Sequence, residues 1–338
     1  MEKSKHTFII AEAGVNHNGD VELAMKLIEA AKNAGADAVK FQTFRAENLV
    51  TRDAPKADYQ TKTTGSGGQY DMLKKLELSI DDHLHLKRYC DALNIEFMST
   101  PFDFESADLL EKIGIKRFKI SSGDLTTTPF LSYVAKFNKP MILSTGMANL
   151  GEIEAAIESV EQAGNDQISL LHCTSNYPTA PEDVNLNAIM TMKNAFKRPV
   201  GYSDHTIGSE ISIAAVAMGA EIIEKHLTLD KNMEGPDHKA SMEPDELERL
   251  IRNIRIVELS LGDGIKKCRK SEEKSKIVSR KSIVAKRPIM RGEKIKEDML
   301  DYKRSENGLS PMQNHLLIGK MAAINIRKND ALRFEQLI

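Results

Sequence analysis

The segment FIIAEAG (8–14) is the first of eight short apolar runs in this chain, and each run ends in a cluster of polar residues. The other seven are DAVKFQT (37–43), IEFMSTPF (95–102), RFKISSG (117–123), PMILSTG (140–146), ISLLHCTS (168–175), PVGYSDH (199–205) and EIIEKHLTL (221–229). Stretches with helical spacing of apolar residues separate these runs. Strand and helix alternating eight times predict an α/β fold, a (β/α)8 TIM barrel. An open doubly wound sheet is the competing fold, but it is disfavoured because polar clusters follow all eight strands.

The composition of the chain excludes several classes of protein. A formal net charge of −2, no Trp and 5% aromatic residues are poor material for nucleic-acid binding. No stretch approaches the roughly 20 apolar residues of a membrane span. Three cysteines, far apart and odd in number, argue against a disulfide framework. The sequence also lacks the glycine motifs of nucleotide-binding proteins and the signatures of serine and zinc hydrolases. We therefore expect a cytoplasmic enzyme with reduced thiols.

The sequence pattern predicts two domains and one long insertion. We expect the barrel to span residues 1–265, a charged linker to span 266–280, and a small β-rich domain to span 281–338, where short β-like runs alternate with turn signals. Residues 44–79 separate the second strand from its helix. A segment of this length is usually a lid over a ligand or a disordered loop, and a passive insertion is the plain alternative.

The polar residues at several strand ends predict an anion site. Lys40 and Gln42 lie two residues apart and therefore share one face of the second strand. Lys119 lies in the fourth strand, followed by Ser122, and Ser144 ends the fifth. Lysines inside a barrel are costly unless an anion compensates them, and hydroxyl groups with glycine-exposed amides suit a phosphate. A Schiff-base lysine is the alternative, which the presence of two lysines disfavours.

Acidic and imidazole groups end three other segments. Glu12 ends the first strand, where a carboxylate can act as a general base. His205 and His226 end the adjacent seventh and eighth strands, a donor set that suits Mn²⁺, Fe²⁺, Co²⁺ or Zn²⁺. Asp237 follows the eighth strand and is expected either to bind substrate hydroxyls or a metal-bound water, or to form a structural turn.

Taken together, these clusters resemble the sialic acid synthase family, the bacterial nonulosonic acid synthases that condense phosphoenolpyruvate with an N-acylated hexose. The matching blocks run in order along essentially the whole chain and include FIIAEAGVNHNGD, GADAVKFQTF, FKISSGD, ILSTGMANLGEIEAA, VGYSDHTIG, EKHLTLDKNMEGPDHKASMEP and KRSENGLSP. The C-terminal region resembles the antifreeze-like (SAF) domain of that family. This implies a domain-swapped homodimer in which the tail of one subunit caps the barrel of its partner.

The resemblance also implies roles for particular residues. The phosphoenolpyruvate site would comprise Lys40, Lys119, Ser122, Ser144 and Ser203, with Glu12 as a candidate base. The metal ligands would be His205 and His226, holding a divalent ion for which Mn²⁺ is expected and Mg²⁺ or Co²⁺ are alternatives. Contacts to the sugar would come from Gln42, Asp124, Asn176, Tyr177 and Asp237, and from Arg304 of the partner subunit. The segment TSNYP leaves open whether Ser175 or Asn176 contacts the ligand.

Several functions remain compatible with this resemblance. The first expectation is synthesis of N-acetylneuraminate from phosphoenolpyruvate and open-chain N-acetylmannosamine, with release of phosphate. The alternatives are N,N′-diacetyllegionaminate synthesis from 2,4-diacetamido-2,4,6-trideoxymannose and pseudaminate synthesis. A non-catalytic sugar-binding or ice-binding protein is a different class. It is disfavoured because such a protein has no need of paired barrel lysines and histidines.

Overall fold

The computed structural model describes residues 6–56 and 58–338, except for the side chains of residues 58, 59 and 62. The chain divides into two compact units, Met1–Asp263 and Gly264–Ile338, and each is described by itself. Within the described residues, no helix combines the length and apolar character that crossing a membrane requires.

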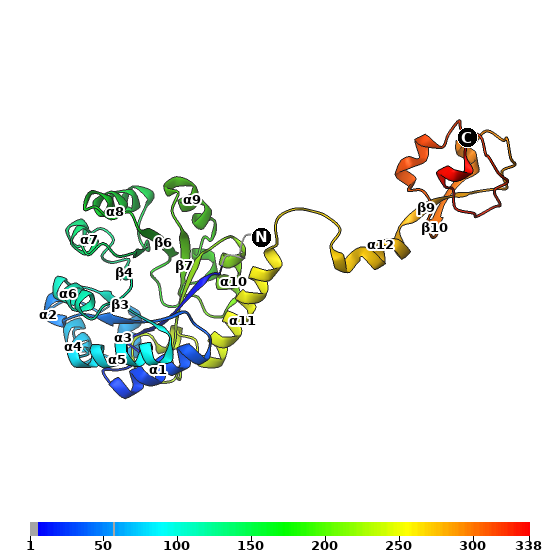
Figure 1. Cartoon of the computed structure of the whole chain (residues 1–338). Helices are drawn as coiled ribbons and strands as arrows, with labels where there is room; N and C mark the ends of the chain where they lie inside the picture. Colours follow the sequence, from blue (N-terminus) through cyan, green and yellow to red (C-terminus); the bar gives the residue numbers. More distant parts are fainter. Residues whose placement is uncertain (1–5, 57) are drawn as a thin grey trace. The chain divides into compact units, whose positions relative to one another are not determined.

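Eight parallel strands form the centre of the first unit (Figure 1). They are β1 (Phe8–Gly14), β2 (Ala38–Thr43), β3 (Glu96–Pro101), β4 (Phe118–Ile120), β5 (Met141–Ser144), β6 (Ile168–Cys173), β7 (Val200–Asp204) and β8 (Ile222–His226). Their order is β3-β2-β1-β8-β7-β6-β5-β4, and the two outermost strands, β3 and β4, also pack against each other. This arrangement confirms the predicted TIM-barrel fold.

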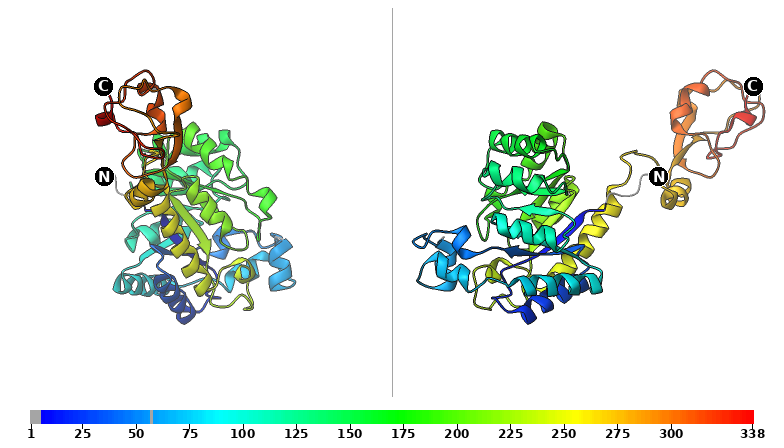
Figure 2. Two further views of the ribbon diagram at one scale, coloured as in Figure 1. Left: turned by 90° about the vertical axis from the view of Figure 1, so that its right-hand side faces the viewer. Right: turned by 60° about the vertical axis from the view of Figure 1, so that its left-hand side comes forward.

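A ring of helices surrounds the strands, as Figures 1 and 2 show. The ring comprises α1 (Val21–Asn33), α5 (Ile80–Leu93), α6 (Phe104–Lys112), α7 (Thr128–Ala135), α8 (Leu150–Gln162), α9 (Asn187–Phe196), α10 (Glu210–Ala217) and α11 (Pro244–Leu261). Local sequence sets several helix starts. The Asp20 side chain accepts hydrogen bonds from the first turn of α1, and capping boxes at Ser79 and Asn149 begin α5 and α8.

The barrel interior is layered, and the layers explain where the polar residues lie. One layer is apolar and consists of Ile10, Ala38, Met98, Ile142, Leu171 and Ile222. Two residues further along the same strands, and therefore on the same face, come Glu12, Lys40, Thr100, Ser144, Cys173 and Glu224. The apolar layer closes the barrel below, so the polar layer becomes the floor of a site at the carboxyl ends of the strands.

Residues 44–79 form three short helices, α2 (Ala46–Leu49), α3 (Asp58–Thr64) and α4 (Gln69–Lys74), drawn in light blue in Figure 2. Their buried apolar residues pack with Val15 and Phe44 into a small cluster of their own. The Glu77 carboxylate accepts a hydrogen bond from the Ala46 backbone N–H at 2.7 Å and fixes the start of α2. The described residues of the insertion therefore pack into a cluster separate from the main core of the barrel.

The second unit has a small β-rich core. Strands β9 (Lys281–Ala285) and β10 (Leu300–Arg304) pair antiparallel, and α12 (Glu273–Ser279) precedes them. Their apolar side chains pack with residues such as Ile295, Leu317 and Leu332. Short 3-10 helices complete the two units at Pro181–Asp183, His238–Ala240, Lys270–Glu272, Glu297–Met299, Pro311–Leu316 and Phe334–Gln336.

Candidate functional site

A cavity of about 540 Å³ opens at the carboxyl ends of the barrel strands. Most of the predicted site residues line it: Glu12, Lys40, Gln42, Lys119, Ser122, Ser144, Tyr177, Ser203, His205, His226 and Asp237. These residues come from six of the eight strands and from four of the loops that follow strands. The fold therefore brings together residues that are more than 200 positions apart in the sequence.

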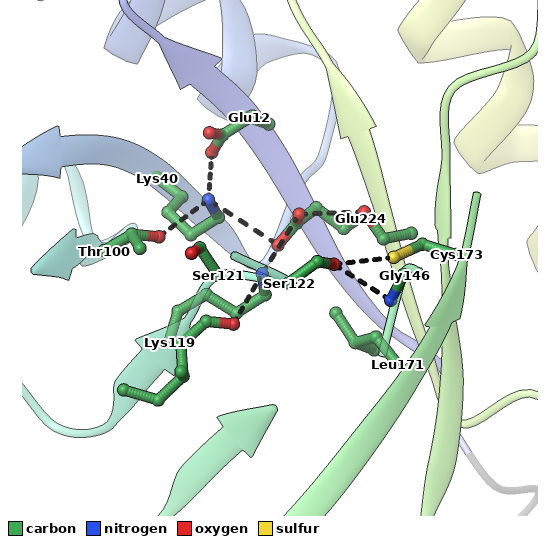
Figure 3. Close-up of polar contacts among 12 residues, drawn as sticks. Glu12, Lys40, Thr100, Lys119, Ser121, Ser122, Gly146, Leu171, Cys173 and Glu224 are labelled. Carbon is green, nitrogen blue, oxygen red and sulfur yellow. Dashed lines mark hydrogen bonds and ion pairs between the residues drawn. The ribbon is translucent and has the colours of Figure 1, made fainter. Parts of the chain in front are cut away.

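Four charged side chains form the floor of the cavity, and we call them the four-charge cluster (Figure 3). Lys40 Nζ lies 2.6 Å from Glu12 Oε2 and 3.8 Å from Glu224 Oε2, and it donates a hydrogen bond to Thr100 Oγ1 at 3.1 Å. Lys119 Nζ lies 3.5 Å from the other oxygen of Glu224. All four charged side chains are at most 5% exposed, so each charge depends on its partners for stabilisation.

The two carboxylates of this cluster have opposite pKa shifts. Burial raises the pKa of Glu12 to about 7, although Lys40 opposes the shift. Burial acts in the same direction on Glu224, but Lys119 and Lys40 outweigh it and lower its pKa to about 2. Glu224 therefore stays a carboxylate, whereas Glu12 can gain or lose a proton near neutral pH. A carboxyl group with that property is suited to general base catalysis.

Hydroxyl and amide groups surround the two ammonium groups. Ser122 Oγ accepts a hydrogen bond from the Gly146 backbone N–H at 3.0 Å and lies 3.2 Å from Cys173 Sγ. A Cβ atom at Gly146 would collide with the side chains of Ser175 and Ser122, so this close approach requires glycine. Ser121, Gly123 and Ser144 also line the cavity. Two ammonium groups beside hydroxyl donors can bind a phosphate or a carboxylate.

The two predicted metal ligands lie side by side. The ring centroids of His205 and His226 are 5.5 Å apart, and Tyr177 packs 4.1 Å from the His205 ring. His205 Nδ1 donates a hydrogen bond to the Thr174 carbonyl at 2.7 Å, which leaves a lone pair on Nε2. Burial lowers the pKa of both histidines, so both rings are neutral near pH 7, the form that binds metal ions.

These two histidines fit a divalent cation as a partial ligand set. His226 Nδ1 is buried without a hydrogen-bond partner among the described residues, and such a polar atom is costly unless a ligand pairs with it. Across the part of the chain that the structure describes, no three His, Cys, Asp or Glu side chains form a complete cation site. A bound cation would therefore need further ligands from substrate or water, as catalytic sites with open positions do.

The remaining predicted residues differ in their placement. Gln42 Nε2 lies 3.4 Å from Glu12 Oε1. Asp237 is buried at the cavity wall, and burial raises its pKa to about 6. Asp124 accepts a hydrogen bond from Ser121 Oγ at 2.6 Å but does not line the cavity. Asn176 is exposed and does not line it either, whereas Ser175 does. Arg304 is an exposed residue of β10 in the second unit.

Sequence reasoning missed some residues of this site. Glu224 was not among the predicted site residues, although its spacing of two from His226 places both on one face of β8. Thr100 was also not predicted. It lies two residues after the apolar Met98 on β3, so both side chains are on the inner face of that strand. The sequence of the insertion indicated that Gln60 and Gln69, beside its glycine-rich segment, could reach a ligand, and both line the cavity. The apolar residues that the insertion contributes carried no such signal. They are Leu49, Val50, Met72, Leu73 and Leu76.

Comparison with known proteins identifies the families to which the two parts of the chain are similar. The NeuB family profile matches residues 27–266, and the SAF domain profile matches residues 280–338. The chain is 53% identical to N,N′-diacetyllegionaminic acid synthase from Campylobacter jejuni over 97% of this chain and 99% of that protein. It is 47% identical to the synthase of the same name from Legionella pneumophila, with 98% and 94% of the two chains covered.

A solved structure gives the same result. The N-acetylneuraminic acid (sialic acid) synthetase from Leptospira borgpetersenii, crystallised with citrate, is 37% identical and superposes with a TM-score of 0.71 over 80% of this chain and 90% of its own. The resemblance to the sialic acid synthases and to the SAF domain is thus confirmed. This chain belongs to the NeuB family.

Proposed function

We propose that this protein is an N,N′-diacetyllegionaminate synthase, which condenses phosphoenolpyruvate with 2,4-diacetamido-2,4,6-trideoxymannose and releases phosphate. The expectation of a nonulosonic acid synthase is confirmed at the level of the family. Two synthases named for the legionaminic product share 53% and 47% of their residues with this chain, against 37% for the sialic acid synthetase. These identities favour the alternative acceptor over N-acetylmannosamine, and over the acceptor of pseudaminate synthesis.

The observation that carries the proposal is a group of apolar side chains from the insertion that lines the same cavity as the charged floor. We define the apolar wall as Leu49, Val50, Met72, Leu73 and Leu76 of the insertion. The trideoxy sugar has a methyl group at C6 and a second acetamido methyl, and both can bury apolar surface there. N-Acetylmannosamine has hydroxyl groups at these positions, and burying a hydroxyl without a partner is costly.

The floor of the cavity supports a site for phosphoenolpyruvate. We propose that Lys40 and Lys119, with Ser122, Ser144 and Ser203, hold its phosphate and carboxylate. A divalent cation on His205 and His226, with Mn²⁺ proposed and Mg²⁺ or Co²⁺ as alternatives, would supply Lewis acidity for the aldehyde of the acceptor.

The chain's own residues then position the reactants. The methylene carbon of phosphoenolpyruvate forms a bond to the aldehyde carbon, the electron pair of the aldehyde C=O bond moves to its oxygen, which takes up a proton, and positive charge develops at the former enol carbon. Water adds to that carbon, and Glu12 accepts the proton that the water loses. Cleavage of the bond between that carbon and the phosphate ester oxygen releases phosphate, and loss of the proton of the added hydroxyl leaves the keto group of the product. The fixed lysines contribute to the rate by positioning and electrostatics.

The family resemblance supports two further parts of the proposal. We propose that the protein is a cytoplasmic homodimer, and that Arg304 of one chain reaches the acetamido group of the acceptor in the barrel of the other. We also propose contacts to the sugar from Gln42, Tyr177 and Asp237, with Ser175 favoured over Asn176 because only Ser175 lines the cavity.

The acceptor is tested by measuring phosphate release from phosphoenolpyruvate and Mn²⁺ with each candidate hexose. We expect kcat/KM for 2,4-diacetamido-2,4,6-trideoxymannose to exceed that for N-acetylmannosamine by at least about tenfold, since one apolar group in a fitted pocket is worth about 10–200-fold. Mass spectrometry of the product confirms which acid forms. Preferential turnover of N-acetylmannosamine would contradict the proposed acceptor and leave the family assignment intact.

The apolar wall is tested by Met72→Gln. Because this change places an amide where the sugar methyl groups are expected, kcat/KM for the trideoxy sugar should fall about tenfold or more, and the preference over N-acetylmannosamine should narrow. Met190→Gln on α9, where the side chain is 43% exposed, is the matched control and should change neither value. An equal fall in kcat/KM for both sugars would show that the apolar wall does not select the acceptor.

The anion site is tested by Lys119→Met, which keeps an unbranched side chain one atom shorter and removes the charge. We expect the KM for phosphoenolpyruvate to rise by about tenfold or more, because a buried charge-assisted hydrogen bond to an anion is lost. Lys139→Met is the control, since Lys139 pairs with Glu111 outside the cavity. Unchanged KM in the Lys119 variant would remove this residue from the proposed site.

The dependence on pH tests Asp237. Its pKa is raised to about 6, so the carboxylate that can accept hydrogen bonds from sugar hydroxyls is present above that pH and is lost as the pH falls through it. Protonation of the Glu12 base, whose pKa is about 7, already lowers kcat/KM for the acceptor as the pH falls, and we expect the decline to steepen by about a further tenfold per pH unit below 6. In Asp237→Asn the value of kcat/KM at pH 8 should be lower, and the steepening below pH 6 should vanish while the decline due to Glu12 remains. A steepening that persists unchanged in the variant would assign it to another group.

A further inference from the structure

A buried ion pair lies directly behind the two histidines. Asp204 stands between Ser203 and His205 at the end of β7, and Lys225 stands between Glu224 and His226 on β8. Because neighbouring residues of a strand point to opposite faces, these two side chains point away from the cavity. Their side chains are 0% and 1% exposed, and they face each other as direct partners in the β7–β8 pairing.

The contacts of this pair hold the turn that carries His205. Asp204 Oδ2 lies 3.0 Å from Lys225 Nζ and accepts a hydrogen bond from Ser212 Oγ of α10 at 2.5 Å. Asp204 Oδ1 accepts hydrogen bonds from the backbone N–H and the hydroxyl of Thr206, at 2.8 and 2.7 Å. Lys225 Nζ donates to the Thr206 carbonyl at 2.6 Å. The residues on both sides of His205 are therefore fixed to β8.

Stability alone does not explain a pair of this kind. Replacing a buried ion pair with apolar residues of similar volume is often neutral or stabilising. What the pair contributes beyond apolar packing is therefore a fixed orientation of its two side chains and a fixed distance between the strands that carry them. The His226 ring lacks a hydrogen-bond partner on Nδ1 among the described residues, unlike most metal-binding histidines. Apart from its ring contacts with Tyr177 and His205, its placement therefore depends on the backbone of β8, which the neighbouring Lys225 fixes relative to β7.

We propose that Asp204 and Lys225 are positioning residues, which hold the His205 and His226 imidazoles at the separation at which both can bind one divalent cation. This inference rests on the cation included in the proposed function. The pair itself touches neither the cation nor the substrates. Its effect passes through the turn at Thr206 and through the register of β7 and β8.

The test is Mn²⁺ affinity, measured by calorimetry on the full chain without substrates. The double variant Asp204→Asn with Lys225→Met removes both charges and leaves no unpaired ion. We expect it to bind Mn²⁺ at least about tenfold more weakly, within the range seen when outer partners of metal ligands are lost. We also expect a preserved KM for phosphoenolpyruvate at saturating Mn²⁺, because the anion site lies on other residues.

Two further variants separate positioning from general loss of structure. Ser212→Ala keeps the ion pair and removes one donor to Asp204, so it should fold and shift the affinity in the same direction by a smaller factor. Glu258→Gln alters another buried carboxylate, which accepts from the Thr7 N–H ahead of β1, at the opposite end of the barrel. This control should lower thermal stability and leave Mn²⁺ affinity unchanged.

Four other outcomes would contradict the positioning role, the bound cation or the proposed reaction. Wild-type affinity in both the double variant and Ser212→Ala would overturn the positioning role. Equal weakening in Glu258→Gln would overturn it too, because the effect would then be a general one. A wild-type protein that turns over its substrates without binding Mn²⁺ or other divalent ions would overturn both the cation and this inference, whereas binding without turnover of any candidate hexose would overturn the proposed reaction alone.

Discussion

The balance of charge inside the barrel is the constraint on which the site depends. Two ammonium groups and two carboxyl groups meet inside the barrel, nearly excluded from water. Any one of these charges alone would be too costly to bury there. Together they allow two ammonium groups to be held at the floor of the cavity, where an arriving anion can bind them. The barrel makes this possible because β1, β2, β4 and β8 each supply one member of the cluster.

The same strands serve two purposes on their two faces. On β7 and β8 the inner positions hold hydroxyl, carboxylate and imidazole groups, while the outer positions between them hold a buried ion pair. Because side chains alternate along a strand, three consecutive residues of each segment, 203–205 and 224–226, can both form the site and fix its geometry. The layer below is apolar throughout and separates the site from the opposite end of the barrel.

Much of this could be predicted from the sequence, for physical reasons that particular residues illustrate. The repeated runs gave the barrel, and spacing of two along a strand placed Lys40 and Gln42 on one face. Glu224 was not predicted as a site residue, although its spacing of two from His226 places both side chains on one face of β8. The choice between Ser175 and Asn176 depends on the path of a loop, which periodicity does not encode. The helices of the insertion were not predicted, since segments of four to seven residues carry too little pattern.

The separate core of the insertion has a consequence for how such enzymes diversify. The groups proposed to make and break bonds stand on the strands, whereas the surface proposed to meet the variable end of the sugar belongs to a segment with its own packing. A change in that segment need not disturb the layers of the barrel. Relatives can therefore acquire new sugars by remodelling one excursion of the chain, while the condensing machinery is inherited intact. The insertion is therefore the segment to exchange when the range of products is to be altered by engineering.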